Sequence, residues 1–421
     1  MKTKLLFLLW LPVFCFSQNS EKECADTERQ LDTLVKADKY DMAYLLWESS
    51  AKCISESINM NGEKILVHLL AAPTTDAQKQ KYIAELLKIY ESDDKSFPGN
   101  KRSNLVKRAK VLQQYQIGKP EEILTLFDRA FKNDNDNFND SKALYDYFEL
   151  YFGRFKSGDK SLTEDDVLSK QDDLLIKLNQ LIEKSDSGKR DYQTAFDGIK
   201  AIAASINTCE KLTVHYEKKY PANKANISWL QNATENLISQ NCISEPILKT
   251  IASEWHAKQP GAKSAYNMGI IALRSKGDQA EGLKYFNESV ELEKDPARKA
   301  DTYLAIASLY NASDTGKAIG YVKKAMGARP NYGKPYFLLA QLYLSTGCGE
   351  TPFEKKALFL LASQTAAKAA AIDPSLKSSA TIIAEKYLKK APSKEEIKEA
   401  KQSGKTIKFA CGINESVTIP Q

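Results

Sequence analysis

The chain has 421 residues, with 60 Lys or Arg against 54 Asp or Glu, so its formal charge is +6. A balance this mild argues against nucleic acid or an acidic polymer as the partner. Its 19 Gly and 14 Pro residues are dispersed, and no long flexible linker is visible. Because about 400 residues exceed what one compact core usually holds, an elongated helical array is favoured.

The N-terminus predicts an export signal. Lys2 and Lys4 give it a basic start, residues 5–16 form an apolar run, and Ser17 is a small residue at the end of that run. This pattern is typical of a secretory signal peptide spanning residues 1–17 and cleaved after Ser17, and the run is too short for a stable membrane span. Cleavage lowers the formal charge from +6 to +4 because two lysines are lost.

A lipid anchor on Cys15 is the alternative interpretation of this segment. Bulky Phe14 argues against an anchor, because it stands where a small residue is normally needed. No later stretch reaches 18 consecutive apolar residues, so we expect no transmembrane segment after signal cleavage.

Residues 18–260 are expected to form an array of helical hairpins with degenerate repeats. Residues at i, i+4 and i+7 share one helix face. Two sets of small or apolar residues have that spacing behind turn-forming residues, namely Ala43, Trp47 and Ser50, and Ile123, Phe127 and Ala130. Further helical runs are expected at residues 104–115, 142–155, 163–183 and 229–240.

Residues 261–390 contain three copies of one pattern. Each copy begins with a similar run, at Gly269, Ala307 and Ala340, and has a second apolar stretch that stops at a proline, namely Pro296, Pro330 or Pro374. The first two prolines are 34 residues apart, which is the period of a tetratricopeptide repeat. Such repeats stack helix pairs into a curved surface that holds another molecule.

The second half of each copy explains how the two helices of a pair can approach closely. Mostly small residues recur at i, i+4 and i+7: Gly282, Phe286 and Ser289; Ala318, Val322 and Ala325; Ala362, Ala366 and Ala369. Gly277 and Asp278 mark the turn inside the first pair. We therefore expect an all-α fold, a right-handed solenoid of antiparallel, tetratricopeptide-like helix pairs. An ordinary helical bundle with alanine-rich faces is the alternative.

The C-terminal part, residues 391–421, is expected to hold a helix and a β-hairpin. Residues 406–413 alternate between polar and apolar, residues 414–416 are turn-forming, and residues 417–419 continue the alternation. A period of two predicts strands. Since two strands alone are marginal in water, this hairpin must dock on the helices.

The mature chain holds six cysteines, and an even number in an exported protein predicts disulfides. In an antiparallel helix pair the start of the first helix faces the end of the second, and the first two predicted pairs are centred on predicted turns. The expected bonds are Cys24–Cys53, Cys209–Cys242 and Cys348–Cys411. Closing a loop of about 30 residues stabilises by roughly 3–4 kcal/mol in the chain-entropy model. Six buried free thiols are the alternative.

Nothing in the chain predicts an enzyme. It has no dinucleotide-binding or phosphate-binding glycine loop, no nucleophile elbow and no His-Glu-x-x-His. His68, His215 and His256 lie in helical runs and are read as structural, and no Cys-x-x-Cys spacing predicts a metal site. Trp47, Trp229 and Trp255 lie at helical core positions. We expect no catalytic residue, no metal and no cofactor.

Several segments resemble exported tetratricopeptide-repeat proteins of Gram-negative bacteria that carry a cysteine-bearing C-terminal tail. The most specific are Tyr40-Asp-Met-Ala-Tyr-Leu-Leu-Trp, Asn61-Gly-Glu-Lys-Ile-Leu, Ser264-Ala-Tyr-Asn-Met-Gly, Ala371-Ile-Asp-Pro and Cys411-Gly-Ile-Asn-Glu-Ser-Val-Thr-Ile. In that family a Trp usually follows the tail cysteine, where this chain has Gly412. The resemblance implies export across the inner membrane, a periplasmic or envelope location and protein contacts, with no catalytic residues.

The expected function is a non-catalytic scaffold that binds a protein or peptide on its concave face. On the repeat template, the first helix of each pair lines that face. The expected groove residues are Lys263, Tyr266, Ile270, Arg274, Leu304, Ser308, Asn311, Lys334, Phe337 and Gln341. Their aromatic, amide and basic groups suit a peptide of polar and acidic character. A glycan-binding or nutrient-uptake accessory protein of the envelope is the alternative.

Overall fold

The computed structural model describes residues 15–53, 55–97, 104–311 and 313–421, with backbone only at residues 15–21 and 276. The signal peptide expected at residues 1–17 therefore lies outside the described side chains. The chain divides into two compact units, Met1–Ala204 and Ser205–Gln421. The sequence predicts a different boundary, at residue 260, between degenerate and regular repeats. That boundary stays a prediction.

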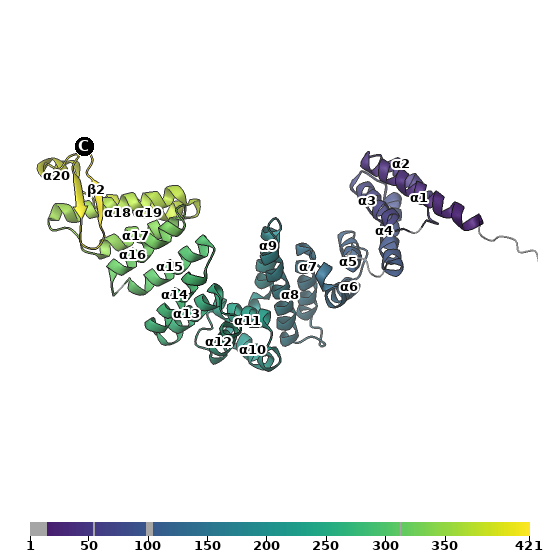
Figure 1. Ribbon diagram of the computed structural model, residues 1–421, viewed down its shortest axis with the longest axis horizontal. Helices are drawn as coiled ribbons and strands as arrows, with labels where there is room; N and C mark the ends of the chain where they lie inside the picture. Colours follow the sequence, from purple (N-terminus) through teal and green to yellow (C-terminus); the bar gives the residue numbers. More distant parts are fainter. Residues whose placement is uncertain (1–14, 54, 98–103, 312) are drawn as a thin grey trace, which may run out of the picture. The chain divides into compact units, whose positions relative to one another are not determined.

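The first unit is an array of helices, each packed on its neighbours in the sequence (Figure 1). Its helices are α1 (Cys15–Lys36), α2 (Tyr40–Ser49), α3 (Glu56–Ala71), α4 (Asp76–Ser96), α5 (Asn104–Gln114), α6 (Pro120–Asn133), α7 (Ser141–Lys156), α8 (Glu164–Lys184) and α9 (Lys189–Ile202). Two short 3₁₀ turns, Asn135–Asn137 and Ala203–Ser205, follow α6 and α9. The helical runs expected in this region are confirmed with small shifts at their ends.

Local sequence sets several helix starts in this unit. Pro120 is the first residue of α6, where its missing N–H leaves no hydrogen bond unmade. The Thr163 side chain accepts a hydrogen bond from the backbone N–H of Asp166, whose carboxylate in turn accepts from the Thr163 N–H. This capping box satisfies two of the free N–H groups at the start of α8.

A cluster of aromatic side chains forms part of the core of the first unit. Phe127, Phe138 and Tyr147 are fully buried, and their ring centroids lie 5.7–6.2 Å apart. The Tyr147 hydroxyl donates a hydrogen bond to Asp128, and the ammonium of Lys170 lies 3.0 Å from the same carboxylate. The Tyr147 hydroxyl, which is the polar group of this cluster, is therefore hydrogen-bonded, as buried hydroxyls generally are.

The second unit continues with helix pairs and ends in a small sheet (Figure 1). Its elements are α10 (Cys209–Asn223), α11 (Ile227–Ser239), α12 (Pro246–Lys258), α13 (Ala262–Lys276), α14 (Gln279–Leu292), α15 (Pro296–Tyr310), α16 (Thr315–Ala328), α17 (Gly333–Ser345), α18 (Pro352–Ile372), α19 (Lys377–Leu388), α20 (Lys394–Glu399), β1 (Thr406–Phe409) and β2 (Glu415–Thr418). A 3₁₀ turn, Pro374–Leu376, lies between α18 and α19.

The three predicted repeats are three helix pairs: α13 with α14, α15 with α16, and α17 with α18. Gly277 ends α13 in the left-handed conformation, and Asp278 caps α14 by accepting from the Glu281 N–H at 2.9 Å. Pro296 ends the first pair and is also the first residue of α15. All nine residues of the predicted i, i+4 and i+7 faces are buried, which confirms the helix-pair solenoid.

The C-terminal hairpin is confirmed as an antiparallel pair in which Thr406 faces Thr418 and Phe409 faces Glu415. Its turn comes earlier than expected, at residues 410–414 rather than 414–416. The reason is local: Gly412 and Asn414 have φ angles of 86° and 46°, so the chain reverses before Glu415.

Three disulfide bonds join the cysteines in the predicted pairs. The Cα atoms of Cys24 and Cys53 and of Cys209 and Cys242 lie 5.3 Å apart, and those of Cys348 and Cys411 lie 5.9 Å apart. The first two bonds each tie the open end of one helix pair, and the third ties the hairpin turn to the loop after α17.

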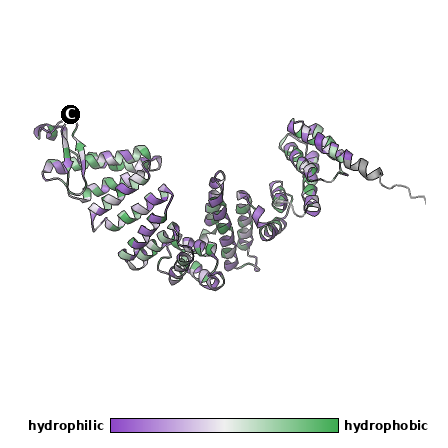
Figure 2. Cartoon of the chain, in the orientation of Figure 1, coloured by the Kyte–Doolittle hydropathy of each residue, from purple (hydrophilic) through white to green (hydrophobic). Residues whose placement is uncertain are grey.

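Apolar and polar residues share every helix of both units (Figure 2), as expected for helices that bury one face. None of the described helices is long and apolar enough to span a bilayer.

Candidate functional site

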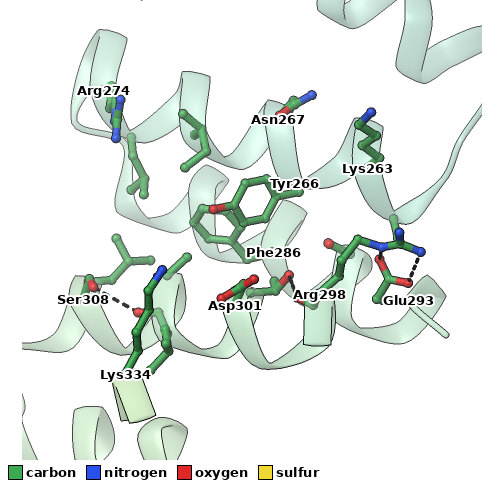
Figure 3. A pocket seen from close by; sticks show the side chains of 18 of the residues that line it. Lys263, Tyr266, Asn267, Arg274, Phe286, Glu293, Arg298, Asp301, Ser308 and Lys334 are labelled. Carbon is green, nitrogen blue, oxygen red and sulfur yellow. Dashed lines mark hydrogen bonds and ion pairs between the residues drawn. The ribbon is translucent and has the colours of Figure 1, made fainter. Parts of the chain in front are cut away.

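A pocket of about 830 Å³ opens along α13 and α15 in the second unit. Helix α14 closes its floor, and the start of α17 forms part of one wall (Figure 3). Seven of the ten expected groove residues line it: Lys263, Tyr266, Ile270, Arg274, Leu304, Ser308 and Lys334. The repeat spacing thus brings residues from three helices to one cavity.

The other three expected residues do not line this pocket. Asn311 is exposed at the C-terminal end of α15, and Gln341 is exposed on α17. Phe337 is half-buried and packs against the cluster of Tyr336, Ala369 and Ala380. On α17 only the first turn reaches the pocket.

Two aromatic rings build the floor. Phe286 is fully buried, and its ring centroid lies 5.5 Å from that of Tyr266 (Figure 3). A Cβ at Gly269 would lie only 2.7 Å from the Phe286 ring, so the glycine makes the space that this ring fills. Burial, with the nearby Asp301 carboxylate, raises the pKa of Tyr266, while Arg274 partly offsets the rise. Tyr266 therefore stays a neutral phenol with a hydroxyl able to donate.

Asn267 is one of the buried polar residues that line the pocket. Its side chain lines the cavity and is 8% exposed. Its Nδ2 amide has no hydrogen-bond acceptor among the described residues. A buried donor without a partner costs about 1–3 kcal/mol, so this amide lowers the stability of the pocket wall.

At one end of the pocket, each cationic side chain is paired with a carboxylate. Lys263 lies 2.6 Å from Glu235. Arg298 lies 2.9 Å from Glu293 (Figure 3). Burial by itself would raise the pKa of Glu293, but the hydrogen bonds from Arg298 and from the Asp295 backbone N–H outweigh it and lower that pKa. Glu293 is therefore ionised and neutralises its arginine.

The other end carries uncompensated positive charge. Arg274 and Lys334 line the pocket from opposite sides, with Lys334 next to Ser308 (Figure 3), and neither makes an ion pair within the described chain. Asp301, between the two ends, accepts a hydrogen bond from the Tyr332 hydroxyl. The net field of the pocket therefore attracts an anionic group toward Arg274 and Lys334.

Reasoning from the sequence missed several lining residues. Asn267 directly follows Tyr266, while Asp301 and Arg298 lie three and six residues before Leu304 on α15. Helical spacing on α15 could have included Asp301 and Arg298. No repeat pattern marks Phe286 as part of the site, because it enters from the second helix of the pair through the space at Gly269.

One cluster of side chains resembles the catalytic triad of a hydrolase. The Ser264 hydroxyl lies 2.9 Å from Nδ1 of His256, whose Nε2 lies 3.3 Å from Glu288. Ser264 is only 2% exposed, and its hydroxyl also bonds the backbone carbonyls of Gln259 and Gly261. The hydroxyl closes the turn before α13 and does not face the pocket, so the cluster is structural.

Sugar binding by tryptophans and metal binding are the two further kinds of site to consider. Trp229 and Trp255 are 5% and 3% exposed, which agrees with the packing role expected for them rather than with a sugar platform. Within the described residues, no group of three His, Cys, Asp or Glu side chains is placed to hold a metal ion.

No known family model matches the chain. A curated relative, the photosystem I assembly protein Ycf3 of Prochlorococcus marinus (strain NATL2A), is 32% identical over 89 residues, which are 21% of this chain and 50% of that protein. The chain thus spans about half the length of the curated relative that it matches.

Two solved structures resemble the chain. The crystal structure of yeast Tom70 has 12% identity and a TM-score of 0.33, covering 91% of this chain and 100% of that one. The Cut9–Hcn1 hetero-tetramer of the APC/C has 12% identity and a TM-score of 0.35, covering 88% of this chain and 76% of that one. The chain's own helix pairs define the fold, which is a tetratricopeptide-like helical repeat.

Proposed function

We propose that the protein is a non-catalytic scaffold that holds a segment of a protein partner in the pocket between α13 and α15. The proposal rests on the pocket itself, which has an aromatic floor and charged groups at its rim. Peptide segments suit these groups, because a peptide has apolar side chains for the floor and acidic side chains for the cations at the rim.

The kind of segment follows from the charges. An apolar side chain would lie on Tyr266 and Phe286, where it would be removed from water. An acidic group beside it would lie near Arg274 and Lys334, the two cations without a carboxylate partner. The curated relative is an assembly protein, and a role in assembly requires protein contacts, so the shared segment supports the same general kind of role.

A random peptide library displayed on phage is the probe for this function. Panning against the full chain should enrich segments that combine an apolar residue with an acidic one. Synthetic copies of enriched peptides should bind Tyr266→Ala and Arg274→Ala at least about tenfold more weakly than the unchanged protein, as expected for removing an anchor residue.

Phe337→Ala is the matched control. It also removes an aromatic ring from a first helix of a pair, but outside the pocket. Peptide binding should stay within about twofold of the unchanged protein, since the residue touches no bound segment. Enriched peptides that bind all three variants equally well would place the binding surface elsewhere and end the proposal.

We infer that the scaffold works in the periplasm or cell envelope. Three disulfide bonds suit an oxidising compartment, and the first 17 residues have the pattern of a cleavable export signal. Expressed in a Gram-negative bacterium, the protein should be recovered from the periplasmic fraction with Gln18 as its first residue. N-terminal sequencing that finds Met1 or lipid-modified Cys15 would contradict this location or this mode of export.

A further inference from the structure

The C-terminal hairpin covers an apolar surface of the helical array. Four of its side chains, Phe409, Ile413, Val417 and Ile419, are at most 3% exposed. They belong to one cluster with residues of α16, α17 and α18, among them Ile319, Val322, Leu358 and Leu361. Because the hairpin packs against this apolar cluster, residues 406–419 form a cover, called here the tail cover.

Besides this apolar packing, polar contacts and one disulfide hold the tail cover in place. The ammonium of Lys323 on α16 donates to the Ile413 carbonyl at 2.9 Å and pairs with Glu415 at 2.7 Å. The covalent link is the bond from Cys411 in the hairpin turn to Cys348 after α17. Since a two-stranded sheet is marginal by itself, ordering of this segment depends on docking, and the disulfide keeps it near its docking surface.

One of the two residues of this disulfide is open to solvent. Among the six paired cysteines, Cys411 alone is exposed, while its partner Cys348 is 3% exposed. The other two bonds join half-buried or buried residues on both sides. Because thiol–disulfide exchange requires a thiolate to reach one sulfur, access favours reaction at Cys411.

We propose that Cys348–Cys411 is a redox-sensitive latch that holds the tail cover closed. The thiolate of an external dithiol attacks the Cys411 sulfur, the bond between the two cysteines breaks, and Cys348 leaves as a thiolate that takes up a proton. The second thiol of the reductant then attacks the mixed disulfide and releases Cys411. Two electrons pass to the protein, and the dithiol becomes a disulfide.

Opening the latch frees the tail cover and exposes the apolar faces of α16 and α18. The pocket is lined by other surfaces, on α13 and α15 and at the start of α17, so this device is independent of the proposed function. The helices of the first unit keep their own bond, Cys24–Cys53, and stay folded.

The test uses the oxidised full chain in graded dithiothreitol. Free thiols are blocked with N-ethylmaleimide, and mass spectrometry reports each cysteine while hydrogen exchange reports residues 406–419. We expect Cys348 and Cys411 to be modified at about tenfold lower reductant than the other four cysteines. At that point, amides of the hairpin ladder, such as the Ile419 N–H bonded to the Lys405 carbonyl, should exchange at least about tenfold faster.

Two variants complete the experiment. Cys348→Ser with Cys411→Ser should show the fast hairpin exchange without reductant, whereas Cys24→Ser with Cys53→Ser should leave hairpin exchange slow. If the first variant fails to fold, the titration of the unchanged protein still decides. Another pair opening first, or a hairpin that stays protected after both latch cysteines are modified, would overturn the proposal.

Discussion

Replacing Phe286 by Ala is expected to lower the free energy of unfolding of the second unit by about 3–5 kcal/mol. The ring is fully buried, fills the space beside Gly269 and supports Tyr266 at 5.5 Å. Removing it leaves a cavity between α13 and α14 that their backbones cannot close. Native-state hydrogen exchange of the amides in α13–α16 measures the loss in this unit alone. Peptide binding in the pocket should fall with it, because Tyr266 loses its support.

A double-mutant cycle tests whether Gly269 acts through Phe286. Gly269→Ala adds a Cβ at 2.7 Å from the ring and should cost about 1–3 kcal/mol by overpacking. The same change should cost much less in a Phe286→Leu background, where the smaller side chain leaves room. Equal costs in both backgrounds would show that the glycine is needed for another reason.

In the first unit, Tyr147→Ala is expected to cost a similar 3–5 kcal/mol, about as much as any single buried aromatic residue contributes. Tyr147 is fully buried among Phe127, Phe138 and Phe131, and the Lys170 ammonium lies 4.7 Å from its ring centroid. Tyr147→Phe keeps the ring and removes only the hydroxyl, so we expect a loss of about 1–2 kcal/mol. Hydrogen exchange in α6–α8 measures both values.

The pH dependence of the free energy of unfolding separates the contribution of the Tyr147 hydroxyl from that of its ring. Burial, followed by the hydrogen bond to Asp128 and the charge of its carboxylate, raises the pKa of Tyr147 far above its usual value of 10.0. In the unfolded chain Tyr147 ionises near pH 10, whereas in the folded chain it stays neutral. Its contribution is therefore complete below pH 10 and declines as the pH rises above it. Tyr147→Phe lacks this decline, so the stability difference between the two proteins should shrink above pH 10. A difference that stays constant through pH 11 would contradict the assignment.

Much of the fold could be predicted because its determinants are local. A proline spacing of 34 residues and small residues at i, i+4 and i+7 specify helix pairs without reference to distant parts of the chain. Two of the disulfide pairs followed from the same reasoning, since cysteines centred on the turn between two helices meet at the open end of the pair, and Cys348–Cys411 was the pair that remained. The turn of the C-terminal hairpin was misplaced, because Gly412 and Asn414 change the backbone direction in a way that apolar alternation does not record.

Repeat spacing predicts which residues share a helix face, and it placed Lys263, Tyr266 and Arg274 on one face. It does not predict how many successive helices line one cavity. Phe337 has the same register as Tyr266 and still packs into another cluster, because α17 meets the pocket only through its first turn. Helix class, pairing and covalent links were therefore determined by the sequence alone. The tertiary structure decided which cations remain without a carboxylate, that the Asn267 amide lacks an acceptor, and which surface the hairpin covers, since these depend on distances between side chains far apart in the chain.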